Sequence, residues 1–241
     1  MKNFTFTGPY GAIECIVRSC ENENAPVLIM AHGFRGSREG GGRAAELAAK
    51  AGRYVHAVRF NFNGSQILSR QIAELKAVTA AVRKQHPNAK LILLGRSLGG
   101  AAALLTAAQD ASIAGLILWA APNNLRQTFR QALGREQYEL LDSGVTLHLA
   151  DERGQLALTP DFLTDIDKYD LDEVLRTWQK RPVLILHGAK DATVNTEQAR
   201  RNYTLLNVRK EIHIFPDGDH SFSQCSSEAG DIICSWLRQF V

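Results

Sequence analysis

The sequence lacks the features that mark membrane-inserted or exported proteins. Its apolar runs, such as Gly115 to Pro122, are far shorter than the ~20 residues that a membrane-spanning helix needs. Residues Met1 to Thr7 alternate polar and apolar side chains, and they lack the basic start and continuous apolar stretch of a secretory signal. We therefore expect no membrane span and a cytoplasmic location.

The sequence also lacks a large excess of positive or negative side chains. The 28 Lys and Arg residues nearly balance the 25 Asp and Glu residues, which leaves a formal net charge of +3. This near balance of charges does not favour binding to the phosphate backbone of nucleic acids or to an acidic membrane surface. We expect neither partner, and the sequence does not define an oligomeric state.

Cysteines are few, and they match no metal-binding motif. The spacings of Cys15, Cys20, Cys225 and Cys234 fit no zinc pattern, and no His-Glu-x-x-His helix is present. A chain of 241 residues can bury a sizeable core without disulfide bonds. We therefore expect reduced thiols and no metal ion.

What the sequence does contain is a series of short, almost entirely apolar segments bounded by glycine, proline or asparagine, which is typical of strands buried on both faces. Helical stretches separate these segments, and this alternation predicts an α/β fold with a mostly parallel central sheet and helices on both faces. The expected strands are Val27–Ala31, Val55–Phe60, Leu91–Leu94, Ile113–Ala120, Val183–His187 and Glu211–Phe215. The expected helices are Arg43–Ala51, Ser69–Gln85, Leu98–Gln109, Thr196–Leu206 and Glu228–Phe240.

Two regions depart from this alternation. Phe4–Thr7 and Ile13–Arg18 flank a Gly- and Pro-rich turn, which predicts an antiparallel pair at the sheet edge. Residues 123–180 offer only short helices, at 125–133, 161–166 and 171–179, and a hairpin at 151–154. Because this segment contains no linker, repeat or low-complexity tract, we expect a lid inserted into a single domain that spans residues 1–241.

The strongest motif is Gly95-Arg96-Ser97-Leu98-Gly99, between an expected strand and an expected helix. A serine on such a sharp turn adopts a strained backbone, and glycine at positions 95 and 99 avoids collisions with the crossing elements. The helix amino end then favours negative charge that develops beside Ser97. A Gly-x-Ser-x-Gly string also occurs by chance, but this context predicts a nucleophile.

A serine nucleophile needs a base, and the base needs an acid that orients it. His220 lies in the loop after the last expected strand, and Asp191 lies in the loop after 183–187. Both loops follow the carboxyl ends of strands, where ligands of parallel sheets bind. Each residue alone is more typical of an ordinary surface loop, but together they predict a Ser97–His220–Asp191 triad. Asp217 and Asp219 compete for the acid role.

An oxyanion hole requires two N–H donors. We expect one from the backbone of Leu98 and the second from the backbone of Phe34, in the loop after the first buried strand. The side chain of the neighbouring His32 is expected to be structural.

The loop that continues over residues 35–43 is rich in glycine and arginine. It lacks the Gly-x-x-x-x-Gly-Lys-Ser/Thr signature of phosphate-binding loops, which favours a flexible loop with solvated arginines. A weaker hypothesis is that Arg35, Arg38 and Arg96 favour substrates that carry a carboxylate.

The motifs around positions 31–34, 95–100, 187–194 and 218–222 resemble, in order and spacing, those of the α/β-hydrolase superfamily. They look most like its small bacterial esterases, related to cinnamoyl and feruloyl esterases, and like the catalytic domain of prolyl-oligopeptidase-like enzymes. The resemblance covers nearly the whole chain. It implies the α/β-hydrolase fold and hydrolysis of a small carboxylic ester through an acyl-enzyme, without a cofactor.

The same triad would serve an acyltransferase or thioesterase, and the sequence does not separate these activities from an esterase. A small peptidase is a further alternative, which the absence of the gating domain of related peptidases makes less favoured. A binding protein on a hydrolase scaffold is disfavoured because all three triad residues are present. No lid residue matches a family motif, and Tyr138 and Tyr169 are only guesses for substrate contacts.

Overall fold

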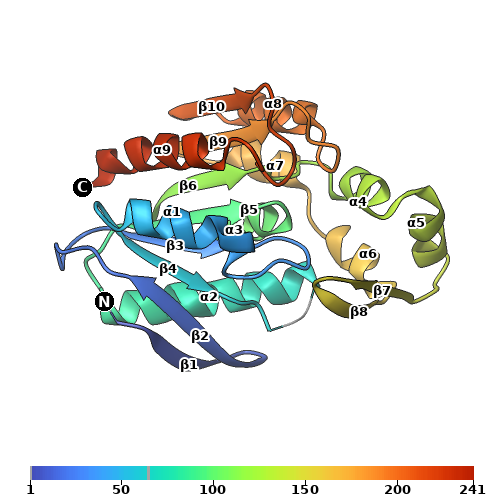
Figure 1. The fold of residues 1–241 in the computed structure, drawn as a ribbon, viewed down its shortest axis with the longest axis horizontal. Coiled ribbons are helices and arrows are strands. Elements are labelled where there is room, and N and C mark those ends of the chain that lie inside the picture. The colour runs from blue at the N-terminus through green and yellow to red at the C-terminus, as the bar shows by residue number, and fades with distance from the viewer. Residues whose placement is uncertain (1, 64–65) are drawn as a thin grey trace.

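The computed structural model describes residues 2–63 and 66–241, so Met1, where the expected domain begins, and residues 64–65 lie outside it. Its main feature is an eight-stranded sheet in the order β1-β2-β4-β3-β5-β6-β9-β10 (Figure 1). Strand β2 is antiparallel to β1 and β4, and the other neighbouring pairs are parallel. The predicted mostly parallel sheet is confirmed. Its strands are β1 Phe4–Gly8, β2 Gly11–Arg18, β3 Val27–Ala31, β4 His56–Phe60, β5 Leu91–Arg96, β6 Ile113–Trp119, β9 Val183–Gly188 and β10 Lys210–Phe215.

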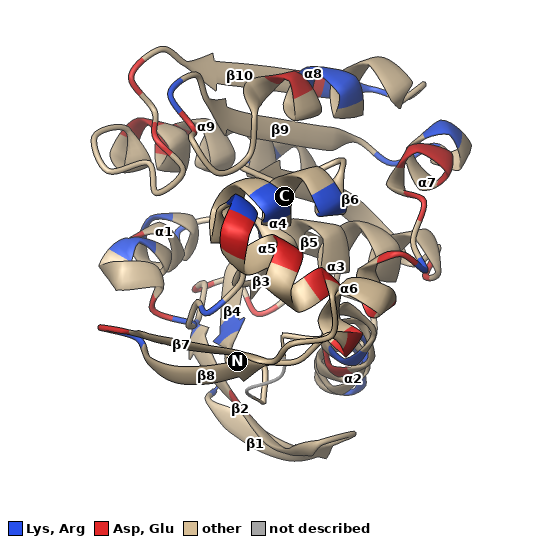
Figure 2. Cartoon of the chain, turned by 90° about the vertical axis from the view of Figure 1, so that its right-hand side faces the viewer, with Lys and Arg blue, Asp and Glu red and all other residues tan. Residues whose placement is uncertain are grey.

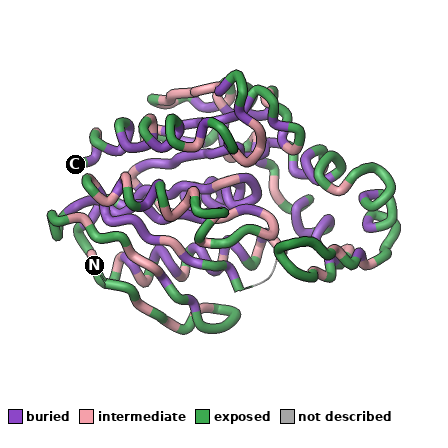
Figure 3. The backbone as a smooth tube through the Cα atoms, viewed as in Figure 1, coloured by how far each residue is buried: buried purple, intermediate pink, exposed green. Residues whose placement is uncertain are grey.

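Helices cover both faces of the sheet because successive side chains of a strand point to opposite faces. Leu28 and Ile92 pack with α1 and α9, whereas Ile29 and Leu93 pack with the helices of the other face. Figure 3 shows the buried strands between the two partly exposed helical layers. The helices are α1 Arg43–Ala51 and α9 Ser226–Leu237 on one face, and α2 Leu68–Gln85, α3 Leu98–Ala108 and α8 Thr196–Leu205 on the other, with short 3-10 helices at Gly40–Gly42 and Arg238–Phe240.

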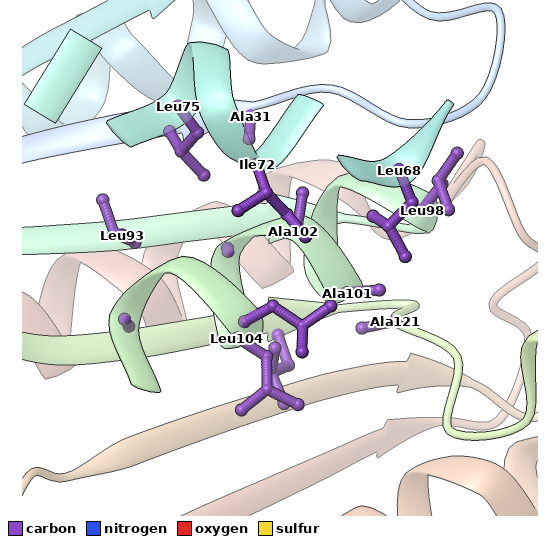
Figure 4. Packing of buried hydrophobic residues seen from close by; sticks show 14 of the residues in the cluster. Ala31, Leu68, Ile72, Leu75, Leu93, Leu98, Ala101, Ala102, Leu104 and Ala121 are labelled. Carbon is purple, nitrogen blue, oxygen red and sulfur yellow. The ribbon is translucent and has the colours of Figure 1, made fainter. Parts of the chain in front are cut away.

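Small residues let α3 pack closely against the sheet and α2. Ala102 of α3 lies beside Ile72 of α2, and Leu98 lies beside Leu68 (Figure 4). Burying a large apolar side chain such as Leu68 contributes about 1.5–3 kcal/mol. This packing fixes the start of α3, which is where Ser97 stands.

The segment between β6 and β9 forms an insertion at the carboxyl end of the sheet (Figure 1). It consists of α4 Leu125–Leu133, α5 Arg135–Asp142, the hairpin β7 Leu147–Asp151 and β8 Gly154–Leu158, α6 Asp161–Ile166 and α7 Leu171–Thr177. Figure 2 views the molecule from this side, with α4 and α5 in front and the β7–β8 hairpin below them. The expected hairpin and three short helices are present. Helix α5 was not predicted, because only two of its side chains, Tyr138 and Leu141, are buried.

Candidate functional site

Ser97 stands on a sharp turn between β5 and α3. Its backbone has φ 52° and ψ −128°, outside the regions that ordinary residues favour. A side-chain carbon on Gly95 would lie 2.2 Å from the carbonyl oxygen of Gly99, and one on Gly99 would lie 2.3 Å from the carbonyl oxygen of His32. Both glycines are therefore required by close approach, as the sequence predicts, and they let the strand, the turn and the loop after β3 meet.

The structure brings together the three side chains that the sequence singles out. Ser97 follows β5, Asp191 follows β9 and His220 follows β10. His220 Nε2 lies 3.1 Å from Ser97 Oγ, and His220 Nδ1 lies 2.8 Å from Asp191 Oδ2. Both distances are within hydrogen-bond reach, so one imidazole connects the hydroxyl to the carboxylate.

Asp191 is held as a carboxylate inside the protein. Its Oδ1 accepts hydrogen bonds of 2.8 Å from the backbone N–H groups of Thr193 and Val194. Burial opposes ionisation, but the hydrogen bond and charge of His220 together with these N–H groups lower the pKa of Asp191 below its ordinary value. An ionised Asp191 can therefore orient His220 and stabilise its protonated form at neutral pH.

The competing acids lie elsewhere. Asp217 pairs with Lys190 at 2.5 Å, and Asp219 accepts hydrogen bonds from the N–H and hydroxyl of Ser223. No hydrogen bond between either carboxylate and the ring of His220 is found among residues 2–63 and 66–241.

His187, which the sequence reasoning did not single out, supports Asp191 from behind. Its ring is fully buried, with Nε2 2.8 Å from the carbonyl oxygen of Val194 and 3.4 Å from Asp191 Oδ2. Burial lowers the pKa of His187, so the ring is neutral and its Nε2–H donates to Val194. The sequence feature that could have indicated His187 is its position near the end of the buried strand β9.

The two expected oxyanion donors flank Ser97. Leu98 begins α3, and Phe34 follows Gly33, on which a side-chain carbon would lie 2.8 Å from Ser97 Cβ. Within the described part of the chain, the backbone N–H groups of Phe34 and Leu98 donate no hydrogen bond, so both can donate to a ligand. His32 is structural, as expected: its Nε2 accepts the N–H of Phe62 at 3.1 Å, and burial lowers the pKa of the ring.

A cavity of about 570 Å³ opens beside the Ser97 hydroxyl. Ser97, His220 and Phe34 form its scaffold side, while Phe129 of α4 and His148 of β7 belong to the opposite wall. The rings of Phe34 and Phe129 meet edge to face, with centroids 5.2 Å apart. The volume suits a small organic substrate, and the aromatic walls suit an apolar group on it.

A larger cavity of about 730 Å³ between α4, α7 and α8 contains neither Ser97 nor His220. Its guanidinium groups are already neutralised, because Arg126 pairs with Asp167 and Arg201 pairs with Asp172. We therefore place the candidate site in the cavity beside Ser97.

The expectation of solvated arginines is wrong for Arg35. Its side chain is only 7% exposed and pairs with Asp151 of the hairpin at 2.8 Å, while its backbone N–H donates to Gln66 Oε1. Arg38 pairs with Glu14 at 2.6 Å. A carboxylate neutralises each of these two arginines, so neither is available for an anionic substrate in this structure.

The two tyrosines suggested as substrate contacts do not line the cavity beside Ser97. The hydroxyl of Tyr138 accepts a hydrogen bond from Arg126, and that of Tyr169 lies 2.9 Å from Ser69 Oγ. Both guesses are wrong, since these tyrosines connect parts of the insertion and its neighbouring helix.

The structure also bears on metal binding and on membrane insertion. Among residues 2–63 and 66–241, no group of three or more His, Cys, Asp or Glu side chains is arranged to hold a metal ion. In the same residues, no helix is long and apolar enough to cross a membrane.

Comparisons with known proteins show what this chain is similar to. In a curated protein of Salmonella typhimurium, named "Uncharacterized protein YfhR", 131 residues align at 29% identity, covering 54% of this chain but only 40% of that protein. The chain thus matches less than half the length of this relative.

Solved structures of similar fold include Est1E from Butyrivibrio proteoclasticus, with a TM-score of 0.81, 18% identity and coverage of 100% of this chain and 97% of that one. The esterase domain of a Rhodothermus marinus protein has a TM-score of 0.74 and 20% identity, over 99% of this chain and 98% of that one. The profile of the "Alpha/beta hydrolase family" matches residues 28–230. The chain belongs to the alpha/beta hydrolase family.

Proposed function

We propose that the protein hydrolyses small carboxylic esters through an acyl-enzyme formed on Ser97. The observation that carries this proposal is the hydrogen-bond chain from Ser97 Oγ to His220 at 3.1 Å and from His220 to Asp191 at 2.8 Å, at the wall of a 570 Å³ cavity. Because Asp191 is ionised and buried, it holds the His220 ring with Nε2 free to accept a proton.

In the first half of the reaction, Ser97 Oγ bonds to the ester carbonyl carbon while His220 Nε2 takes the hydroxyl proton. The carbonyl electrons move to oxygen, and the N–H groups of Phe34 and Leu98 donate to the resulting oxyanion. Removing one such donor in other enzymes costs about 10²–10³ in rate. When the intermediate collapses, the bond to the alcohol oxygen breaks, and the alcohol leaves with the proton from His220.

In the second half, a water molecule gives a proton to His220 and attacks the acyl carbon. Collapse of this intermediate releases the carboxylic acid, and the proton returns from His220 to Ser97 Oγ. Asp191 stays ionised and stabilises the imidazolium in both halves. Every step uses groups of this chain and water, and no cofactor is needed.

Residues 123–180, as the lid of a single domain, are proposed to supply the wall that selects the substrate. Phe129 from α4 and Phe34 from the scaffold line one cavity, which supports an apolar or aromatic acyl group. A structure of Est1E with bound ferulic acid has a TM-score of 0.81 and 16% identity, over 98% of each chain, and it supports the same class of substrate.

A panel of neutral esters that vary in acyl length and aromaticity tests the proposal. The wild-type chain should hydrolyse at least the aromatic or medium-length members, and Ser97→Ala should lose several orders of magnitude in kcat/KM with an unchanged circular dichroism spectrum. Product analysis with added alcohols and with thioesters separates hydrolysis from acyl transfer and thioester cleavage. A wild-type chain that turns over none of the esters, or a Ser97→Ala variant of equal activity, would reject the proposal.

A further inference from the structure

A second, smaller cavity lies beside the nucleophile turn, and none of its described lining residues also lines the substrate cavity. Its volume is about 60 Å³, and neither Ser97 nor His220 lines it. Its walls come from the Gly- and Arg-rich loop after β3, the start of α1 and the ends of β5 and β6, and they include Gly36, Arg38, Arg43, Arg96, Trp119 and Ser221. A water molecule needs about 10–15 Å³ of such space. The cavity can therefore hold an ion several atoms in size.

The charged side chains that line the described part of this cavity are all basic. Arg38, Arg43 and Arg96 line it, and no Asp or Glu does in the part of the chain that the structure describes. Arg38 is neutralised by Glu14 at 2.6 Å. Across residues 2–63 and 66–241, by contrast, Arg43 and Arg96 take part in no ion pair.

Arg96 is the more confined of these two cations. Its Nη2 donates to the carbonyl oxygen of His220 at 2.8 Å, which leaves further N–H donors of the guanidinium unassigned. Burial and the nearby charge of Arg43 lower the pKa of Arg96, and the charges of Asp191 and Asp219 oppose this effect. Arginine nevertheless stays protonated at neutral pH, so two like charges face one small space.

Trp119 also lines this cavity, and its indole N–H is an unsatisfied donor. The side chain is only 5% exposed, and its Nε1–H has no hydrogen-bond partner among the described residues. The ring packs edge to face on Phe222, which fixes its orientation. A buried donor without a partner costs free energy, and an acceptor in the adjoining cavity would remove that cost.

We propose that this cavity binds one small oxyanion, a phosphate, sulfate or carboxylate group, held by Arg43, Arg96 and the indole N–H of Trp119. Two guanidinium groups that form no ion pair among the described residues, together with an unsatisfied N–H, favour an acceptor with several oxygens over a cation. The site is separate from the ester cavity, and it joins the loop that carries Phe34 to the turn that carries Ser97.

Isothermal titration calorimetry with inorganic phosphate, sulfate and acetate, at constant ionic strength made up with chloride, tests this site. At least one of the oxyanions should bind the wild-type chain saturably at one site per chain. Arg43→Gln should weaken that binding at least about 10-fold, because it removes a charge-assisted donor, and Trp119→Phe should weaken it about threefold, because it removes only the N–H.

Arg135→Gln provides the matched control, since the Arg135 side chain is 87% exposed on α5 and, among the described residues, pairs with Glu139 alone. That variant should bind the anion as the wild type does. Thermal unfolding of every variant without anion checks that the fold is retained. Absence of saturable binding for all three oxyanions, or equal binding by the wild type, Arg43→Gln and Trp119→Phe, would overturn the proposal. The outcome does not depend on whether the protein hydrolyses esters.

Discussion

The carboxyl edge of the sheet and the insertion that faces it are built in different ways. Around Ser97, Asp191 and His220, the backbone does most of the positioning, through buried strands, two glycines and N–H groups that hold Asp191. The insertion is held to the rest of the chain by long-range side-chain contacts, such as Arg35 with Asp151 and Ser69 with Asp165. Its hairpin strands are largely exposed.

We infer from this difference that the sheet edge performs the chemistry and that the insertion selects the substrate. Side chains at the ends of buried strands cannot move far without breaking the core, so the reacting groups stay aligned. A hairpin whose strands are largely exposed can change in sequence at most of its positions at little cost to the fold. We therefore expect changes at the sheet edge to affect mainly kcat, and changes in the insertion to affect mainly KM.

The largest effect is expected for His220→Ala. Loss of the base should lower kcat/KM for a neutral ester by about 10⁴–10⁶, and the double variant with Ser97→Ala should be no worse than either single variant, because the groups act as a unit. Steady-state kinetics on the four proteins measures this. Additive losses in the double variant would show that the two side chains act independently.

The second-largest effect is expected for Asp191→Asn, which should lower kcat by about 10⁴ because the amide favours the wrong tautomer of His220. A group whose pKa is lowered on folding stabilises the protein above its unfolded pKa and ceases to do so as the pH falls through the folded pKa. The pKa of Asp191 is lowered. Its contribution should thus be present at pH 7 and should disappear in acid, below the ordinary pKa of an aspartate.

Urea unfolding of the wild type and Asp191→Asn, compared from neutral pH down to the acid limit of folding, checks this. The difference between the two free energies of unfolding should shrink as the pH falls. A difference that grows in acid would contradict a lowered pKa for Asp191.

The pair Arg35–Asp151 tests the insertion side of the comparison. Arg35→Ala should raise KM for the preferred ester about tenfold with a smaller change in kcat, because the hairpin wall loses its link to the loop that carries Phe34. Asp151→Asn should act in the same direction, and the double variant should add little. Arg176→Ala is the control, since Arg176 is 54% exposed in α7 and does not line the cavity.

If Arg35→Ala lowered kcat and left KM unchanged, the pair would instead support the groups that react at the sheet edge. The same would follow if Arg176→Ala had an equal effect, because the change would then not be specific to the hairpin.

The smallest effects are expected for Tyr138→Phe and Tyr169→Phe. Tyr138→Phe loses one hydroxyl contact inside the insertion and Tyr169→Phe loses one between the insertion and α2, and each loss should cost about 1 kcal/mol of stability or less. Changes in kcat/KM should stay below about twofold, because neither tyrosine lines the cavity beside Ser97. A tenfold loss of kcat/KM in either variant would mean that the tyrosine reaches the substrate.

The same two regions differ in how far the sequence predicts them. Strand–helix alternation and the glycines around Ser97 act over a few residues, so the strands and the helices of the sheet and the loops that carry Asp191 and His220 could be placed within three residues of their observed positions. The contact between Arg35 and Asp151 joins residues 116 positions apart, and no local pattern encodes it. Helix α5 was not predicted, because its surface is mostly exposed and its sequence therefore shows little apolar periodicity.

Labelling with a fluorophosphonate probe, followed by peptide mass spectrometry, tests the central claim most directly. A serine activated by His220 should bond to phosphorus and expel fluoride, so the mass increase should appear on Ser97 in the wild type and be absent in Ser97→Ala and strongly reduced in His220→Ala. An unlabelled Ser97 in the folded wild-type protein, or labelling of another serine at the same rate, would contradict the account.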